Sequence, residues 1–170
     1  IISRSRMNRP LIEIELAFVL GDDLGGPTTT PVDVLRATEF VVPSIEIVDG
    51  RFQPGSTNPL VDSIADAASC GAIIIGANPV SLLDIDPRQV AGALYVDGEV
   101  EMSGMAAAVM GNPVNAVAWL ARKLAEFDVT MQAGHTVLSG SFIAAVPIEG
   151  PAAYVADFGP LGQISFGISD

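Results

Sequence analysis

The feature that most constrains this chain is a pair of carboxylates inside an apolar segment. Residues Leu11–Leu20 read LIEIELAFVL, so that Glu13 and Glu15 alternate with apolar residues before the segment becomes wholly apolar. This pattern predicts a largely buried β-strand, on which residues two apart project from the same face. Two carboxylates on one face of a buried strand are unfavourable unless a proton or a cation neutralises them. The segment therefore indicates either a cation site or a sheet face that is open to water.

A divalent cation is the simplest partner for these carboxylates. A site made only of oxygen atoms favours Mg²⁺, Mn²⁺ or Ca²⁺ over zinc. Asp49 ends the next apolar segment, Phe40–Asp49, and could supply a third oxygen beside Glu13 and Glu15. The spacing alone does not choose between this hypothesis and a solvated sheet face, because Glu-x-Glu is common in strands.

The remainder of the chain predicts a β-rich α+β domain with few helices. Thr30 and Pro31 are typical of a helix start, and this helix should run to about Glu39. A longer helix is expected at Pro113–Phe127, where apolar residues recur with the helical period, and a short helix within Leu60–Ser69. An Asp-Gly dipeptide between two of the strands predicts a tight hairpin turn. Strands are predicted at Leu11–Leu20, Phe40–Asp49, Ala72–Ile75, Gly92–Val96, Glu99–Ser103, Thr136–Leu138, Ile143–Pro147, Tyr154–Phe158 and Gln163–Ile168. Of these, Ala72–Ile75 is expected to be a buried strand.

Composition and charge exclude several classes of protein. The 170 residues fit one domain, and 49% of them are hydrophobic whereas 16% are charged, which is typical of a folded chain. The net charge of −12 argues against nucleic-acid binding. The apolar runs are too short for a membrane span, and no segment resembles a signal peptide, so we expect a cytoplasmic enzyme. The single cysteine, Cys70, excludes an internal disulfide and a cysteine-rich zinc site, and we expect it to be a small buried residue.

Candidates for other catalytic chemistry are weaker. His135 is the only histidine, follows a glycine and is typical of a turn. The run Ser139-Gly140-Ser141 lacks the flanking pattern of a nucleophile elbow, which argues against a serine hydrolase. The same run could still offer hydroxyl and backbone N–H groups to a substrate carboxylate. We therefore predict Ser139, Gly140 and Ser141 as substrate-binding residues.

Several segments together resemble one known family. They are, in chain order, Glu13–Gly21, Ala37–Glu39, Val42–Asp49, Asp62–Asp66 with Ser69–Gly71, Asn112–Ala121 and Leu138–Ser141. These segments resemble the fumarylacetoacetate hydrolase superfamily, and most closely its branch of 2-oxo acid hydratases and 4-oxalocrotonate decarboxylases. The likeness covers nearly the whole chain. Within the branch, Ala125–Val129, Gly140–Phe142 and Gly162–Ser165 are most similar to hydratases that act on 2-oxo-hept-3-ene-1,7-dioate.

The resemblance implies a fold, a cofactor and a reaction. The fold would be a mixed β-roll with few peripheral helices, and residues 1–170 would form a single metal-binding catalytic domain. Glu13, Glu15 and Asp49 would hold Mg²⁺, or Mn²⁺, and the cation would bind a small 2-oxo acid substrate. The reaction would be the Mg²⁺-dependent addition of water to a 2-oxoalkenoate or 2-hydroxydienoate in the breakdown of aromatic compounds.

The same family offers three alternatives to a hydratase. They are a decarboxylase of the 4-oxalocrotonate type, a C–C hydrolase, and a catalytically silent homologue that acts as a structural partner. The resemblance also implies a homo-oligomer, or a complex between sister decarboxylase and hydratase chains. No nucleic-acid or membrane partner is expected.

The chain departs from the family pattern at three places. The family implies an active-site lysine from a segment before the Glu-x-Glu strand, whereas the only lysine here is Lys123, on the predicted helix. Asp66-Ala67-Ala68 stands where relatives usually have Asp-Asn-Ala, and the loop Phe52–Pro59 lacks their basic residues. We therefore expect that an N-terminal segment is missing from these residues. We also expect that they bind Mg²⁺ and that turnover is slow without the proton carrier of that segment.

Overall fold

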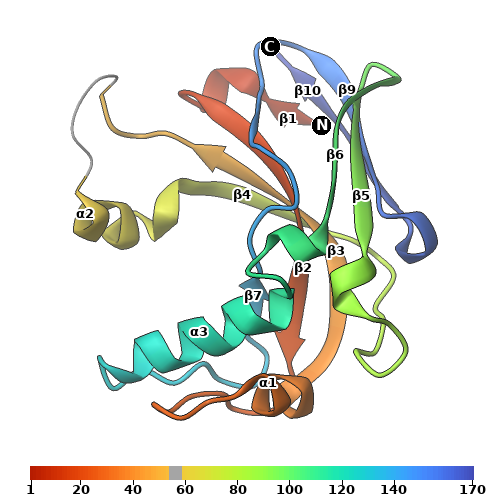
Figure 1. Cartoon of the computed structure of the whole chain (residues 1–170). Helices are drawn as coiled ribbons and strands as arrows, with labels where there is room; N and C mark the ends of the chain where they lie inside the picture. The colour runs from red at the N-terminus through yellow and green to blue at the C-terminus, as the bar shows by residue number, and fades with distance from the viewer. Residues whose placement is uncertain (54–58) are drawn as a thin grey trace.

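The computed structural model describes residues 1–53 and 59–170 as two five-stranded sheets packed against each other, with helices outside them (Figure 1). The first sheet has the order β1 (Ile2–Ser3), β10 (Gln163–Ser169), β9 (Ala152–Asp157), β5 (Ala91–Val96) and β6 (Glu99–Met105). The second has β4 (Cys70–Ile75), β3 (Thr38–Asp49) and β2 (Pro10–Leu20), followed by β7 (Thr136–Leu138) and β8 (Val146–Pro147), which pair with different parts of β2. The β1–β10 pair is parallel and the other pairs are antiparallel. This strand-rich arrangement confirms the predicted β-rich α+β class.

The helices are short and peripheral. Those of the described residues are α1 (Pro31–Ala37), α2 (Leu60–Ala65) and α3 (Pro113–Ala125), together with the 3-10 turns η1 (Arg4–Arg6), η2 (Ala67–Ser69), η3 (Pro87–Gln89), η4 (Ala106–Ala108) and η5 (Gly159–Leu161). Helices α1 and α3 lie against each other at one end of the second sheet, whereas α2 lies apart from them (Figure 1). Across the described ranges, each helix is too short or too polar to span a membrane.

The centre of the fold is the long antiparallel pair of β2 and β3. On β2, the alternating residues Ile12, Ile14, Leu16 and Phe18 are all 0% exposed. They lie opposite apolar residues of β3, and this face packs against the first sheet. The approach is close, because a Cβ added at Gly92 on β5 would lie 2.6 Å from the Cδ1 atom of Ile14. Burying one face of β2 in this way leaves the other face, with its glutamates, outside the core.

Helix α1 begins as predicted and ends slightly earlier. The Asp33 side chain accepts from Thr30 N at 2.8 Å, and Thr30 Oγ1 accepts from Asp33 N at 3.4 Å, which forms a reciprocal capping box. The helix ends at Ala37 rather than near Glu39, because Thr38 already pairs with Leu20 as the first residue of β3.

Helix α3 confirms the predicted apolar stripe. Val114, Val117 and Ala121 are buried, while Leu120 and Leu124 are partly buried against the same core. The helix ends at Ala125, two residues before the predicted end. Its stripe covers one end of the second sheet, so α3 closes the core without entering it.

The strand β4 lies at the edge of the second sheet. The segment predicted as a buried strand is β4, but Ile73 and Ile75 are 45% and 42% exposed. The prediction of full burial was wrong because β4 is an edge strand, and only alternate residues of it face the core. The predicted loop over residues 52–59 lies partly outside the described residues, which exclude 54–58.

The turn between α2 and β4 is left-handed. The predicted helix over residues 60–69 stops at Ala65, and Ala67, Ala68 and Ser69 have φ angles of 52°, 53° and 66°. A left-handed conformation costs an L-residue roughly 1–2 kcal/mol, and asparagine tolerates it better than alanine. Arg51 stabilises the turn, since its Nε bonds Asp66 Oδ1 at 2.7 Å and its Nη2 donates to Asp66 O at 2.7 Å. The chain therefore holds three consecutive residues at this turn in a backbone conformation that favours glycine or asparagine.

This strain gives a test of the fold. We expect Ala68→Gly to raise the free energy of unfolding by about 0.5–1 kcal/mol, because glycine adopts positive φ without the clash of a Cβ atom. The matched control, Ala116→Gly in the middle of α3, should lower it by about 1 kcal/mol. Urea denaturation measures both. A loss of stability in Ala68→Gly would mean that residues 67–69 do not form a left-handed turn.

Candidate metal centre

Three glutamates converge on one face of the second sheet. Glu13 and Glu15 lie two residues apart on β2, and Glu46 lies directly opposite Glu13 on β3. Residues opposite each other in an antiparallel pair project from the same face, with their Cβ atoms about 5 Å apart. Each of the three side chains offers a carboxylate oxygen, and these oxygens lie within 4.8 Å of one another. The predicted pair is therefore joined by a third carboxylate from the neighbouring strand, and we call the three glutamates the carboxylate cluster.

The structure does not bring Asp49 to the carboxylate cluster, contrary to the prediction. Asp49 lies three residues beyond Glu46, so its side chain leaves the opposite face of β3. Its Oδ1 atom accepts from the backbone N–H groups of Asn8 at 2.9 Å and Arg9 at 2.8 Å. Asp49 thus fixes the backbone that leads into β2. The signal for Glu46 was present in the sequence, because it interrupts an apolar segment as Glu13 does, but only the strand register shows that the two meet.

The loop after β7 holds one member of the carboxylate cluster. Gly140 N donates to Glu15 Oε2 at 2.6 Å, a short charge-assisted bond. The loop reaches this position because Ser139 N donates to Leu16 O at 3.0 Å and continues the pairing of β7 with β2. Gly140 has φ +107°, a value that favours glycine. Glu15, at 2% exposure, is therefore oriented by a backbone N–H before any ligand arrives.

The two serines of this loop bond within the loop. Ser141 Oγ donates to Ile143 O at 2.8 Å, and Ser139 Oγ donates to Gly140 O at 3.4 Å. Their hydroxyls thus shape the loop beside Glu15. The prediction that residues 139–141 contact a substrate stays a prediction, now with the loop placed next to the carboxylate cluster.

Burial disfavours charge on all three glutamates, and repulsion from neighbouring carboxylates adds to this effect at Glu13 and Glu15. Burial raises the pKa of Glu15 to about 7, and the charges of Glu46 and Glu13 act in the same direction, while the Gly140 N–H group opposes them. Burial, followed by the charge of Glu46, also raises the pKa of Glu13. Burial likewise raises the pKa of Glu46. Glu15 therefore takes up a proton near neutral pH unless a cation neutralises its charge.

Cys70 lies beside the carboxylate cluster as a thiol. Its side chain is hydrogen-bonded to Glu46, and as the donor it lowers the pKa of that carboxyl group. Burial, followed by the charge of Glu46, raises the pKa of Cys70 itself to about 11. The residue is partly rather than fully buried, and its protonated thiol fits the predicted packing role better than a reactive one.

The carboxylate cluster fits a hard divalent cation. Its donor atoms are all carboxylate oxygens, they lie within 4.8 Å of one another, and their raised pKa values show a demand for positive charge. Mg²⁺ prefers oxygen ligands in octahedral geometry and usually keeps several waters, and three carboxylates would leave positions for water or a substrate. Glu13, Glu15 and Glu46 are thus the residues that could hold such an ion.

The remaining candidates lie elsewhere in the fold. Lys123 Nζ bonds Glu126 Oε2 at 2.7 Å on the exposed side of α3. His135 Nδ1 accepts from Gln132 N at 3.2 Å, and its carbonyl accepts from Leu20 N, five residues further along β2 than Glu15. His135 is therefore a turn residue, as its sequence context indicated.

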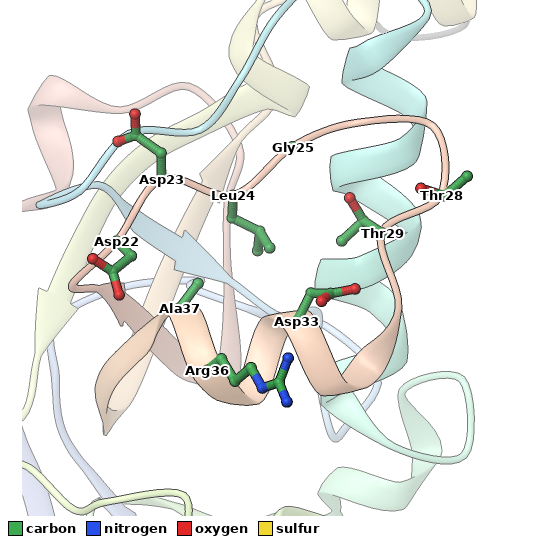
Figure 2. A pocket seen from close by; sticks show the side chains of 9 residues that line it. All are labelled: Asp22, Asp23, Leu24, Gly25, Thr28, Thr29, Asp33, Arg36 and Ala37. Atoms are coloured by element: carbon green, nitrogen blue, oxygen red, sulfur yellow. The ribbon is translucent and has the colours of Figure 1, made fainter.

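A second group of acidic residues lines a cavity of about 400 Å³ beyond the end of β2 (Figure 2). Asp22 and Asp23 lie on one side of it, with Asp33 and Arg36 of α1 on the other (Figure 2). Two of these carboxylates are already used in the fold, since Asp33 caps α1 and Asp23 Oδ1 accepts from Ala133 N at 2.9 Å. This cavity is separate from the carboxylate cluster and has no comparable convergence of oxygens.

Comparison with known proteins places the chain in a family. Residues 1–158 match the family described as Fumarylacetoacetate (FAA) hydrolase C-terminal, and the chain belongs to this family. The 2-oxo-hept-4-ene-1,7-dioate hydratase of Escherichia coli is 40% identical over 169 residues, which are 96% of this chain and 63% of that protein. The TodF product hydratase of Pseudomonas putida is 41% identical over 157 residues, which are 92% of this chain and 58% of that protein.

A solved structure agrees with this assignment. The 4-oxalocrotonate decarboxylase from Pseudomonas putida G7, complexed with magnesium and adipate, matches with a TM-score of 0.92 and 32% sequence identity. The match covers 99% of this chain and 63% of the decarboxylase. Both the predicted family and the predicted fold are thereby confirmed. The chain spans less than two thirds of the length of each of these three proteins.

The raised pKa of Glu15 predicts how stability depends on pH. Because this pKa rises from 4.5 to about 7 in the folded protein, the folded state binds more protons than the unfolded chain between these values. In EDTA, the free energy of unfolding should therefore fall as pH rises from about 4.5 to about 7, by roughly 3 kcal/mol for this one group. Urea denaturation at several pH values measures the slope. Glu15→Gln should flatten it, whereas the exposed control Glu99→Gln should leave it unchanged; an equally steep slope in Glu15→Gln would contradict the assignment.

Glu46 and Asp49 are the two candidates for the third carboxylate of the site, and substitution of each should affect a different property, Mg²⁺ binding or stability. Glu46→Gln should weaken Mg²⁺ binding by roughly 100-fold or more, because loss of an outer-shell partner alone costs about 10–100-fold. Asp49→Ala should leave Mg²⁺ binding nearly unchanged but lower stability by about 1–3 kcal/mol, since the N–H groups of Asn8 and Arg9 lose their acceptor. Calorimetric titration with Mg²⁺ and urea denaturation in EDTA separate the two. Loss of Mg²⁺ binding in a folded Asp49→Ala variant would restore Asp49 as the ligand.

Proposed function

We propose that this protein is a divalent-cation-dependent hydratase that adds water to a 2-oxoalkenoate or its 2-hydroxydienoate form. The observation that carries the proposal is the convergence of Glu13, Glu15 and Glu46 in a chain whose matched relatives include hydratases of such compounds. We take Mg²⁺ as the cation, with Mn²⁺ as a substitute, because all the ligand atoms are carboxylate oxygens.

Each part of the site would have a separate role in catalysis. Bound at the carboxylate cluster, the cation would supply the positive charge that polarises the 2-oxo and carboxylate oxygens of the substrate. Gly140 N–H holds the Glu15 carboxylate in place, so that little reorganisation would accompany cation binding. The loop 139–141 lies beside Glu15 and would meet the substrate carboxylate there. Lys123 and His135 lie away from the cluster, so neither is assigned the proton transfer that hydration requires.

A decarboxylase of the 4-oxalocrotonate type is the second candidate. It is favoured by the decarboxylase with a TM-score of 0.92, which was solved with magnesium. Hydration is preferred because the curated relatives cited above, at 40% and 41% identity, are hydratases, whereas the decarboxylase is 32% identical. Both reactions need electrons to be drawn towards the 2-oxo group, which explains how one site could serve either. We also propose a role in aromatic catabolism, which the hydratase relatives support. A cytoplasmic location and a homo-oligomeric assembly are proposed only from the family resemblance.

Product analysis tests the proposed reaction. With Mg²⁺ and 2-hydroxyhexa-2,4-dienoate, the protein should consume the dienol absorbance with uptake of water and without release of CO₂. Glu46→Gln should reduce kcat/KM by roughly 10²–10³-fold, because the cation supplies several kcal/mol of charge stabilisation. Release of CO₂ from 4-oxalocrotonate at the faster rate would instead establish the decarboxylase. Tight Mg²⁺ binding with no detectable turnover of either kind, even slow turnover, would overturn both candidates and establish the catalytically silent homologue.

A further inference from the structure

Ser44 is a buried polar residue that the carboxylate cluster described so far does not use. It lies on β3, directly opposite Glu15 on β2 and two residues before Glu46, so its side chain projects from the carboxylate face. The residue is 0% exposed, and within residues 1–53 and 59–170 its hydroxyl has no hydrogen-bond partner. A buried unpaired hydroxyl is unfavourable, and such groups are uncommon in folded proteins. The unpaired hydroxyl therefore indicates a hydrogen bond that forms only when the site holds a cation.

The neighbours of Ser44 limit what this contact can be. Its register partner on β4 is Ile75, whose side chain cannot form a hydrogen bond, and its register partner on β2 is Glu15. The Oε2 atom of Glu15 already accepts from Gly140 N at 2.6 Å. The other carboxylate oxygen, Oε1, is available to a second donor. The strand register thus offers Ser44 one charged acceptor, on the strand next to it.

The length of the serine side chain decides whether it is a ligand or a support. The Ser44 oxygen is bonded directly to Cβ, whereas the carboxylate groups of Glu13, Glu15 and Glu46 begin two carbon atoms further out. Ser44 Oγ therefore lies nearer the sheet than the carboxylate oxygens, and a cation held by those oxygens would lie beyond it. In this position Ser44 is better placed to donate a hydrogen bond to a carboxylate from the sheet side than to bind the cation directly.

We propose that Ser44 is a positioning residue for the divalent cation, whose hydroxyl donates a hydrogen bond to the Glu15 carboxylate when the three glutamates hold the ion. Glu15 is then held from both sides of β2, by Gly140 N–H from the loop after β7 and by Ser44 from β3. Two donors keep the carboxylate ionised and correctly turned for the ion. The inference rests on the proposed cation site and adds to it a residue that determines how tightly the ion is held.

Cation binding measured without turnover tests this role. Mn²⁺ titration followed by electron paramagnetic resonance should show that Ser44→Ala weakens binding by about 10–100-fold, the usual effect of losing an outer-shell partner. In EDTA the same variant should be as stable as the parent or more stable, because the unpaired hydroxyl has been removed. Ser44→Thr keeps the hydroxyl and should bind Mn²⁺ within a few-fold of the parent. A purely structural serine would give the reverse pattern, with lower stability and unchanged affinity.

Two further variants separate this inference from the proposed function. Ser165→Ala removes an exposed strand serine from the other sheet and should change neither affinity nor stability. Glu46→Gln should abolish tight Mn²⁺ binding. If Glu46→Gln does so while Ser44→Ala binds like the parent, the inference about Ser44 fails and the cation site stands. If the parent itself fails to bind Mn²⁺ and Mg²⁺, the proposed function and this inference fail together.

Discussion

The antiparallel register between β2 and β3 is the constraint on which the fold and the candidate site both depend. One register places Ile12, Ile14 and Leu16 in the core and Glu13 opposite Glu46 on the other face. A slip of one residue would reverse the faces and carry the carboxylates into the core. Repulsion between the glutamates opposes the pairing of β2 with β3. The burial of the apolar face stabilises the same pairing and offsets this repulsion. The hydrophobic core of this protein therefore holds a site that its own charges would otherwise drive apart.

The parts of the fold that could be predicted from the sequence are those determined by local pattern. Alternation in residues 11–20 identified β2, and Thr30 with Pro31 identified the start of α1, since period and capping are properties of neighbouring residues. The parts that failed depend on distant partners. The sequence indicated Asp49 as the third ligand because it ends the apolar segment, and only the pairing of β3 with β2 shows that Glu46 is the residue that meets Glu13. The burial of β4 was overestimated for the same reason, because an edge position cannot be read from the strand itself.

The similarity to both a hydratase and a decarboxylase limits where their difference can lie. A hydratase and a decarboxylase are both similar to this chain over nearly its whole length, so the overall scaffold by itself does not select the reaction. Selection then depends on the groups that surround a bound substrate, such as the loop 139–141 and whatever moves the proton. In this protein the scaffold provides a partly buried group of carboxylates that could hold a cation. Gly140 already donates a hydrogen bond to Glu15, and Cys70 already donates one to Glu46.

The bond between Gly140 and Glu15 joins residues 125 positions apart in the chain, whereas the three glutamates lie within a single pair of strands. Ribosomes add about 5–20 residues per second, so Glu15 leaves the ribosome roughly 6–25 seconds before the N–H group that will hold it. During that interval the first strands can pair only with their negative charges screened by protons and dissolved ions. Cellular magnesium would thus act on the nascent β2–β3 pair first as a counterion, before the Gly140 N–H group is present.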